Sequence, residues 1–324
     1  MLKLFVFIFC SAQLLFSQNS KMKRPPFLKS GDTIAIVAPA GVIKNHATIY
    51  EAADLAKSWK LNSIIGKNVF DQYHHFSATD KKRKTDLQEA LDNPSVKAIW
   101  CARGGYGTVR IIDDLDFTQF KKKPKWIIGY SDITVLHNHI HNLGVETLHA
   151  MMPVNIEFPE EKRRESVNTL KRALFGELET YEISSSHFNT KGVATGQLVG
   201  GNLTLLENLL GSPSSINTDG KILFFEEIGE YKYHIDRLLQ GLKRNGYLDK
   251  CAGIIVGGMS GLKKNTPSYG CRIEELILGA LPNKNIPVLF NFPAGHDPEN
   301  RALYLGRTIE LKITNQTSTI VFLK

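Results

Sequence analysis

The segment GYSDIT, residues 129–134, carries a serine at the point where a predicted strand gives way to a predicted helix. The apolar run Trp126–Ile128 predicts a buried strand, and a glycine ends it. A serine on such a sharp turn presents its hydroxyl at the carboxyl end of a sheet, where the first N–H groups of the next helix can stabilise an oxyanion. Ser131 is therefore a candidate nucleophile, and the N–H of Asp132 is a candidate oxyanion donor. The alternative is that the serine only caps the helix.

A glycine-rich turn, ARGGYG at residues 102–107, follows the preceding predicted strand. Three glycines in four positions allow the backbone to approach a ligand closely, which suits an oxyanion donor or a phosphate cradle. The spacing is not G-x-G-x-x-G, so a dinucleotide site is disfavoured. The alternative is a strand-to-helix turn that contacts no ligand.

A serine nucleophile needs a base, and a histidine base needs an acceptor that orients it. His296 lies in the loop FNFPAGHDPEN, just past a predicted buried strand, where catalytic groups often collect. Glu226 and Glu227 end another predicted strand, and alternation turns one of them towards a pocket and the other outward. The alternatives are a surface histidine and two solvated carboxylates.

The histidines of residues 137–141 do not have the spacing of a metal site. On a helix only His137 and His141 share a face, and no carboxylate lies at a suitable offset. We therefore expect neither a metal nor another cofactor.

Taken together, these segments resemble the LD-carboxypeptidase family. The motifs ARGGYG, GYSDIT, GGNLTLLENLLG, ILFFEEIGE and FPAGHDPEN occur in the family's order, and the resemblance runs from Lys29 to the C-terminus. The family consists of serine peptidases of peptidoglycan recycling and is related to the microcin C immunity peptidases. The resemblance implies a triad of Ser131, His296 and Glu226.

The resemblance also implies the surroundings of the triad. The oxyanion donors would be the backbone N–H groups of Asp132 and Gly105. Apart from the resemblance, substrate contacts are expected from Arg103, by its position alone, and from Gly104 and Asn202. The family often has Glu-Asp where this chain has two consecutive glutamates, which leaves the first position intact.

The activity implied by the resemblance is release of the terminal D-amino acid from peptidoglycan tetrapeptide stems, at an L,D-amide bond. One alternative is a related serine hydrolase that cleaves a peptidyl-nucleotide amide. Another is a non-catalytic binder of wall fragments, which the intact triad residues disfavour. We expect the protein to form a homodimer and to bind a peptidoglycan-derived peptide.

Strands and helices alternate along the first half of the chain, which predicts a parallel sheet covered on both faces. The predicted strands are 33–40, 62–69, 96–102, 125–130 and 146–151, and the predicted helices are 46–60, 79–93, 132–143 and 160–175. We expect a flavodoxin-like N-terminal domain at 25–155, followed by a helix and a polar linker at 156–192.

A second pattern begins at residue 193 and predicts a smaller α/β domain over 193–324, with a mixed sheet. A strand–turn–helix unit over 194–211 comes first. The remaining predicted elements are strands 221–227, 252–257 and 286–292, helices 233–245 and 272–280, and a terminal hairpin over 303–323.

The chain has 324 residues and a formal net charge of +8. Its basic runs at 81–84 and 121–123 are assigned to solvated helix ends and turns. No groove-reading motif accompanies them, so a nucleic-acid partner is not expected, although an anionic wall polymer or substrate suits the charge.

Residues 1–17 predict an export signal, because Lys3 precedes an apolar stretch too short for a comfortable membrane span. We expect cleavage after Ser17, a periplasmic protein and no stable membrane insertion. The alternatives are an uncleaved anchor, or a cytoplasmic protein if the segment is not a functional signal. Cys101, Cys251 and Cys271 do not form a disulfide framework or a zinc site. Cys101 and Cys251 are expected to be buried free thiols, and the alternative is one disulfide bridge in an oxidising compartment.

Overall fold

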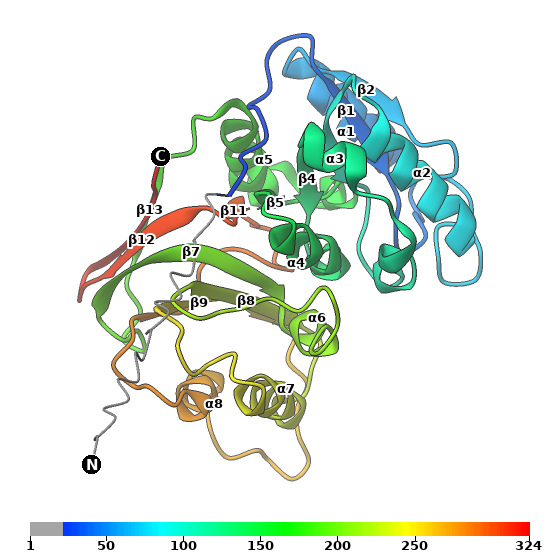
Figure 1. Cartoon of the computed structure of the whole chain (residues 1–324). Helices are drawn as coiled ribbons and strands as arrows, with labels where there is room; N and C mark the ends of the chain where they lie inside the picture. The colour runs from blue at the N-terminus through cyan, green and yellow to red at the C-terminus, as the bar shows by residue number, and fades with distance from the viewer. Residues whose placement is uncertain (1–21) are drawn as a thin grey trace, which may run out of the picture.

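The computed structural model describes residues 22–324, which form two β-sheets with helices packed around them (Figure 1). The expected export segment, residues 1–17, lies outside the described residues. The elements of the first half are β1 (Thr33–Val37), α1 (Ala47–Ser58), β2 (Asn62–Ile65), α2 (Asp80–Asp92), β3 (Val96–Cys101), α3 (Thr118–Lys122), β4 (Trp126–Gly129), α4 (Thr134–Asn142), β5 (Thr147–His149) and α5 (Glu160–Phe175). Those of the second half are β6 (Thr180–Ser184), β7 (Gly192–Asn202), α6 (Leu203–Asn208), β8 (Ile222–Ile228), α7 (Lys232–Arg244), β9 (Gly253–Ser260), α8 (Ile273–Ala280), β10 (Val288–Leu289), β11 (Leu303–Leu305), β12 (Thr308–Ile313) and β13 (Thr317–Phe322).

The first sheet has the strand order β11-β5-β4-β3-β1-β2. Its five strands from β1 to β5 are parallel, and β11 pairs antiparallel with β5 at the edge. The order 2-1-3-4-5 is that of flavodoxin-like folds, so the expected fold of the N-terminal domain is confirmed. Because these strands are parallel, the turns after β1, β3 and β4 meet at one edge of the sheet.

The second sheet has the order β10-β9-β8-β7-β12-β13-β6. Strands β7 to β10 are parallel, and β12, β13 and β6 are antiparallel, which confirms the mixed sheet. The stretch expected to be a linker contains β6, which pairs with β13. This strand lies at the sheet edge and buries only alternate side chains such as Tyr181, so its sequence is polar enough to be mistaken for a loop.

The C-terminal chain interlocks the two sheets. Residues 303–305, expected to begin the hairpin, form β11 in the first sheet instead, and only β12 and β13 make the hairpin. Tyr304 of β11 packs on Trp126 of β4, with ring centroids 5.5 Å apart, and both side chains are fully buried. Helix α4 lies between the two sheets (Figure 1). The sheets therefore share one apolar interior.

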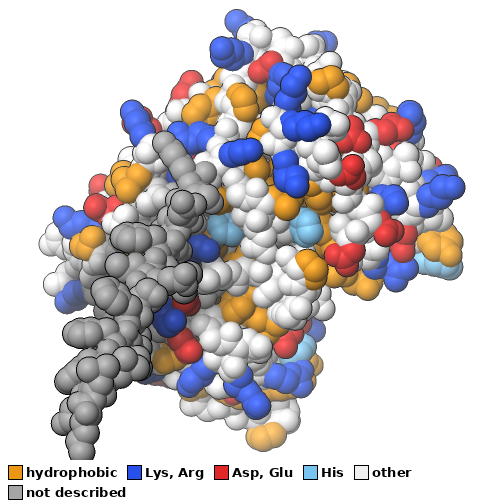
Figure 2. Space-filling model, viewed as in Figure 1, with side chains coloured by type: hydrophobic (Ala, Val, Ile, Leu, Met, Phe, Trp, Pro, Cys, Tyr) orange, Lys and Arg blue, Asp and Glu red, His pale blue; other side chains and the backbone are white. Residues whose placement is uncertain are grey.

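Helix α2 begins as the sequence predicts, because the Thr79 hydroxyl accepts a hydrogen bond from the N–H of Lys82. The basic run on this helix is not uniformly solvated, however. Lys82 pairs with Asp71 at the surface, whereas Arg83 is only 2% exposed. On the face shown in Figure 2, Lys and Arg side chains are interspersed with Asp and Glu side chains.

Within residues 22–324, no helix has the length and apolar character needed to cross a bilayer. The three cysteines are free in this part of the chain. Cys101 and Cys251 are buried, and burial raises the pKa of Cys251 to about 11, so this thiol stays protonated and unreactive.

Candidate active site

Ser131 lies at the tight turn between β4 and α4. Its φ of 61° falls in the left-handed region, which residues other than glycine rarely adopt and which is typical of a nucleophile elbow. Gly129 makes the turn possible, because a Cβ there would lie 2.8 Å from Ile133. Among residues 22–324, no side chain caps the 3-10 turn Ser131–Ile133 or the start of α4. The capping alternative therefore does not describe this serine.

A hydrogen-bonded chain joins Ser131, His296 and Glu226. His296 Nε2 lies 3.0 Å from Ser131 Oγ, and His296 Nδ1 lies 2.7 Å from Glu226 Oε2. With its proton on Nδ1, the imidazole donates to the carboxylate and accepts from the serine hydroxyl. The three side chains come from the β4–α4 turn, the loop after β10 and strand β8, so segments of both sheets contribute to the site. The geometry is that of a hydroxyl activated by an oriented base.

The imidazole and the carboxylate are largely removed from water. Glu226 is fully buried, and this burial raises its pKa, which the hydrogen bond from His296 opposes. Burial by itself lowers the pKa of His296, but the charge and hydrogen bond of Glu226 outweigh it and hold that pKa above the ordinary histidine value. His296 is thus not a surface histidine, and its charged form is stabilised.

Tyr130 holds the imidazole from the side. Its ring meets the His296 ring edge-on, with centroids 5.0 Å apart, and its hydroxyl accepts a hydrogen bond from Asn155 Nδ2 at 2.9 Å. Burial raises the pKa of Tyr130 to about 12, so the phenol remains neutral. Sequence reasoning missed this residue, although its position next to Ser131 was a signal.

Glycines allow the loop that carries His296 to close on β8. A Cβ on Gly295 would lie 2.7 Å from Glu226 Oε2, and a Cβ on Gly257 would lie 2.4 Å from the carbonyl oxygen of Ala294. No side chain could be accommodated at either position without moving the loop. The close approach of the imidazole to its carboxylate therefore depends on both glycines.

Glu227 is buried, as is Glu226, so the alternative of two solvated carboxylates does not hold. Glu227 Oε2 accepts hydrogen bonds from the N–H and hydroxyl of Thr204, at 2.8 and 2.7 Å, and its Oε1 accepts one from Asn202 at 3.0 Å. Of the two carboxylates, Glu226 contacts the imidazole and Glu227 contacts the first turn of α6. Glu227 therefore meets protein donors instead of water.

Asn202, expected to contact substrate, is 3% exposed and has its side chain engaged at both ends. Its Nδ2 donates to Glu227 Oε1 and to Glu226 Oε1, at 3.0 and 3.3 Å, and its Oδ1 accepts from the N–H of Leu205. Its own N–H donates to Thr134 Oγ1 on α4 at 2.9 Å. These contacts orient the carboxylates and tie β7 to α4, which favours a supporting position over substrate contact.

The turn 102–107 packs directly against the serine. A Cβ on Gly104 would lie 3.0 Å from Ser131 Cβ and 3.3 Å from the backbone nitrogen of Asp132, so glycine keeps this space open. Gly105 has a φ of 103°, a conformation that favours glycine. Across residues 22–324, the N–H groups of Gly105 and Asp132 donate to no protein acceptor. Both remain available to an oxyanion.

Arg103 lies half-buried at the same turn, and its Nη1 donates to the carbonyl oxygen of Val42 at 2.5 Å. No acidic side chain of the described residues forms an ion pair with it. Its positive charge is therefore not neutralised locally and can meet an anionic group of a ligand.

His137 is buried, and both of its ring nitrogens have partners within the protein. Its ring nitrogens lie 2.9 Å from Thr147 Oγ1 and 2.9 Å from the carbonyl oxygen of Gly129, and burial lowers its pKa to about 4. Within the part of the chain that the structure describes, no group of three or more His, Cys, Asp or Glu side chains could hold a metal ion.

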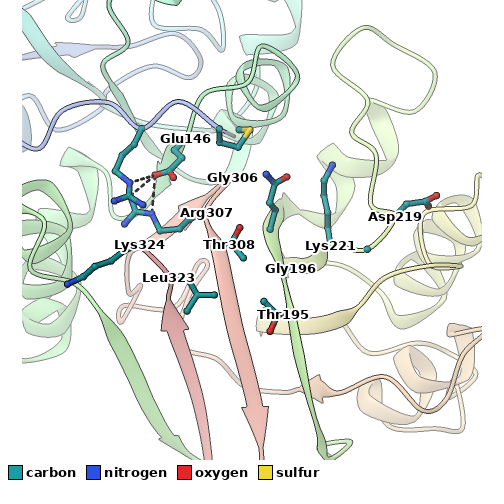
Figure 3. A pocket seen from close by; sticks show the side chains of 14 residues that line it. Glu146, Thr195, Gly196, Asp219, Lys221, Gly306, Arg307, Thr308, Leu323 and Lys324 are labelled. Atoms are coloured by element: carbon teal, nitrogen blue, oxygen red, sulfur yellow. Dashed lines mark hydrogen bonds and ion pairs between the residues drawn. The ribbon is translucent and has the colours of Figure 1, made fainter. Parts of the chain in front are cut away.

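A separate pocket of about 690 Å³ opens where β7 and β12 meet the start of β5 (Figure 3). Arg307 Nη2 lies 2.5 Å from Glu146 Oε2 at its wall, and both side chains are nearly buried. None of the predicted site residues is among the described residues that line it. The pocket is therefore distinct from the site around Ser131.

The chain matches known proteins over almost its whole length. Models of the LD-carboxypeptidase N-terminal and C-terminal domains match residues 34–150 and 195–311. A relative from Bacillus subtilis (strain 168), described as a probable murein peptide carboxypeptidase, is 34% identical over 94% of this chain and 96% of its own. The murein tetrapeptide carboxypeptidase of Pseudomonas aeruginosa is 28% identical over 86% of this chain and 92% of its own.

A solved structure gives the same result. The crystal structure of muramoyltetrapeptide carboxypeptidase from Oxalobacter formigenes superposes with a TM-score of 0.80 and 26% identity, covering 90% of this chain and 99% of that one. The family matches extend over both sheets and include the segments that carry Ser131 and Glu226. The chain therefore belongs to the LD-carboxypeptidase family and is a carboxypeptidase, a hydrolase with a role connected to peptidoglycan.

Proposed function

We propose that this protein is a serine carboxypeptidase that releases the terminal D-amino acid from peptidoglycan tetrapeptide stems. The observation that carries the proposal is the hydrogen-bonded chain from Glu226 through His296 to Ser131. The names of the relatives support a murein peptide as the substrate class.

In the proposed reaction, Ser131 Oγ attacks the carbonyl carbon of the scissile amide while His296 Nε2 accepts the hydroxyl proton. The imidazolium then donates this proton to the leaving amine, and the D-amino acid departs. Water attacks the acyl-enzyme with His296 again as the base, and the tripeptide is released. Glu226 holds the imidazole in the productive tautomer and stabilises its charged form.

The oxyanion of each tetrahedral intermediate would accept hydrogen bonds from the N–H groups of Gly105 and Asp132. In acyl transfer one such donor contributes about 3–4 kcal/mol to transition-state stabilisation. Gly104, which precedes Gly105, packs against Ser131, and both N–H groups are free of protein acceptors among residues 22–324, which supports this assignment.

The free carboxylate of the terminal D-amino acid needs a cationic or N–H partner, and Arg103 supplies a positive charge at the edge of the site. A site built for a carboxylate discriminates by factors of roughly 10⁴ against a ligand that lacks it, because buried donors are left unpaired. We therefore expect an amidated terminus, or a stem extended by one residue, to be a poor substrate.

Mass analysis of muropeptides incubated with the purified protein tests the proposal. We expect a tetrapeptide stem to yield a tripeptide and D-alanine, and the Ser131→Ala variant to be inactive but folded. Equal turnover by parent and variant would show that the nucleophile is wrong. Rapid cleavage of the amidated stem would contradict a carboxypeptidase, and cleavage of an aminoacyl-nucleotide amide alone would favour the peptidyl-nucleotide alternative.

We also propose that the protein is exported and acts on stems outside the inner membrane as a homodimer. The apolar residues 1–17 support export. Cell fractionation with sequencing of the mature N-terminus tests the location, and a cytoplasmic protein that still begins at Met1 would contradict it. Light scattering on the purified protein tests the dimer.

A further inference from the structure

The proposed oxyanion donor of Gly105 belongs to a segment without regular structure. Residues 102–107 connect β3 to a short 3-10 turn and form no helix or strand. An oxyanion donor contributes fully only within a few tenths of an ångström of its ideal position. Some other part of the protein must therefore hold this segment in place.

Arg83 reaches the segment from α2. The guanidinium Nη1 donates to the carbonyl oxygen of Gly107 at 2.9 Å and also to that of Pro39, and its Nε donates to Ala78 at 3.2 Å. The carbonyl of Pro39 belongs to the loop that follows β1. One buried cation thus joins two loops at the edge of the sheet where the site lies.

Burial removes the charge of Arg83 from water, which costs free energy. The side chain is 2% exposed, and a buried guanidinium is tolerated only when its donors are paired. The Nη2 group pairs with Asp80, and the Phe76 ring lies 4.9 Å below the guanidinium carbon. Every nitrogen of the fork is therefore engaged.

Gly107 shows that the fit between the arginine and the turn is close. Its φ is 137°, and a Cβ there would lie 2.7 Å from Arg83 Nη1. The last glycine of RGGYG is thus required by the arginine as well as by the turn. On the other side, the N–H of Thr108 donates to Asp132 Oδ2 at 2.8 Å. The segment is held between α2 and the residue that follows the nucleophile.

We propose that Arg83 is a positioning residue that fixes the turn 103–107, so that the N–H of Gly105 points at the oxyanion formed on Ser131. This inference rests on the proposed serine mechanism. Arg83 does not contact the substrate. It acts on the transition state through the turn, and its loss should lower kcat more than it changes KM.

Arg110 provides a matched control. It pairs with the same Asp80, and its guanidinium carbon lies 5.3 Å from the centroid of the same Phe76 ring. Arg110 is exposed, however, and the described hydrogen bonds of its side chain go to Asp80 and to none of the carbonyl groups of the turn. Replacing Arg110 therefore tests the loss of a nearby arginine while the contacts of Arg83 with the turn remain.

The experiment compares the parent with Arg83→Met, Arg83→Lys and Arg110→Met. We expect Arg83→Met to lower kcat on a tetrapeptide stem by 10- to 100-fold with KM within threefold of the parent, following the loss of one aligned oxyanion donor. Arg83→Lys keeps the charge but loses the planar fork, so its kcat should lie between those of the parent and Arg83→Met. Arg110→Met should remain within threefold of the parent.

Two further measurements separate positioning from stability. Each variant is assayed well below its own melting temperature, and its affinity for a tripeptide boronic acid, which forms a tetrahedral adduct on the serine, is measured. That affinity should fall in parallel with kcat/KM for the Arg83 variants. If Arg83→Met does not fold, Arg83→Lys gives the same comparison.

The inference fails if Arg83→Met and Arg83→Lys keep the kcat of the parent, if only KM changes, or if boronate affinity is unchanged. Labelling of Ser131 by a fluorophosphonate keeps the test independent of substrate identity. If the parent is labelled but cleaves no stem, the substrate assignment fails. In that case slower labelling of the Arg83 variants would still support the positioning role of Arg83, and labelling at the parent's rate would overturn it.

Discussion

Replacing Glu226 with glutamine should nearly abolish turnover while preserving the fold. The carboxylate accepts hydrogen bonds from His296 through Oε2 and from Asn202 through Oε1. A glutamine has one oxygen that accepts and one amide group that donates. If its oxygen faces His296, its NH₂ meets the donating NH₂ of Asn202.

The reverse orientation of the amide is no better for catalysis. Its NH₂ then faces Nδ1 of His296 and favours the tautomer with the proton on Nε2, which cannot accept the proton of Ser131. Both orientations also remove the charge that stabilises the imidazolium. We expect kcat to fall by about 10³–10⁴-fold, which corresponds to roughly 4–5.5 kcal/mol of transition-state stabilisation.

Glu227→Gln is the matched control, because it makes the same change one residue further along β8. Glu227 does not contact the imidazole, and its carboxylate accepts from Thr204, Asn202 and the N–H of Ile228. The variant leaves at least one donor unpaired, which should lower the free energy of unfolding by about 1–3 kcal/mol. Its kcat should fall by less than tenfold, since the chain from Glu226 to Ser131 stays intact.

The assay follows release of D-alanine from a tetrapeptide stem, and thermal melting monitors the fold. The residual activity of Glu226→Gln should also have its acid limb at a lower pH than the parent, because the charge that raises the pKa of His296 is gone. Equal losses in the two variants, or a larger loss in Glu227→Gln, would show that the assignment of the two carboxylates is wrong.

Three other predictions concern the base, the turn and metals. The kcat/KM of the parent should fall as the pH drops through the raised pKa of His296, so its acid limb should lie above the ordinary histidine value of about 6.5; a limb below that value would contradict the pairing with Glu226. Gly104→Ala should lower kcat by about 10²-fold without unfolding the protein, because the new Cβ would crowd Ser131 and the N–H of Asp132. Gly279→Ala, on α8 where an added Cβ would meet nothing within 4 Å, should be silent, and equal effects of the two changes would refute the argument. Activity should survive a chelator, and loss that zinc restores would overturn the serine mechanism.

Much of the N-terminal sheet could be predicted because its signals are local. Both faces of the sheet are covered at Ile34–Val37 and Trp126–Ile128, so these strands are continuous apolar runs. Such runs are easily recognised in a sequence where polar and apolar residues otherwise alternate. The same local signals put Ser131 at a strand end, His296 in a loop and Glu226 at the end of a buried strand. The chemistry of these residue types, together with the order of the motifs, was enough to propose the triad.

The elements that sequence reasoning missed are those defined by distant partners. Strand β6 is polar on one side, and only its pairing with β13 distinguishes it from a loop. Residues 303–305 leave the predicted hairpin because β5 offers a free edge, which no local pattern reveals. Edge strands depend on the availability of a partner more than on propensity.

The sequence by itself determined which residues could do chemistry, since a serine at a strand end or a carboxylate after an apolar run is a local fact. Only the tertiary structure decided what surrounds them. Glu227 is buried because α6 covers its side of the sheet, and Arg83 is buried because two loops fold over it. Burial and hydrogen-bond partners depend on elements that lie far apart in the chain, so they arise only when those elements pack together.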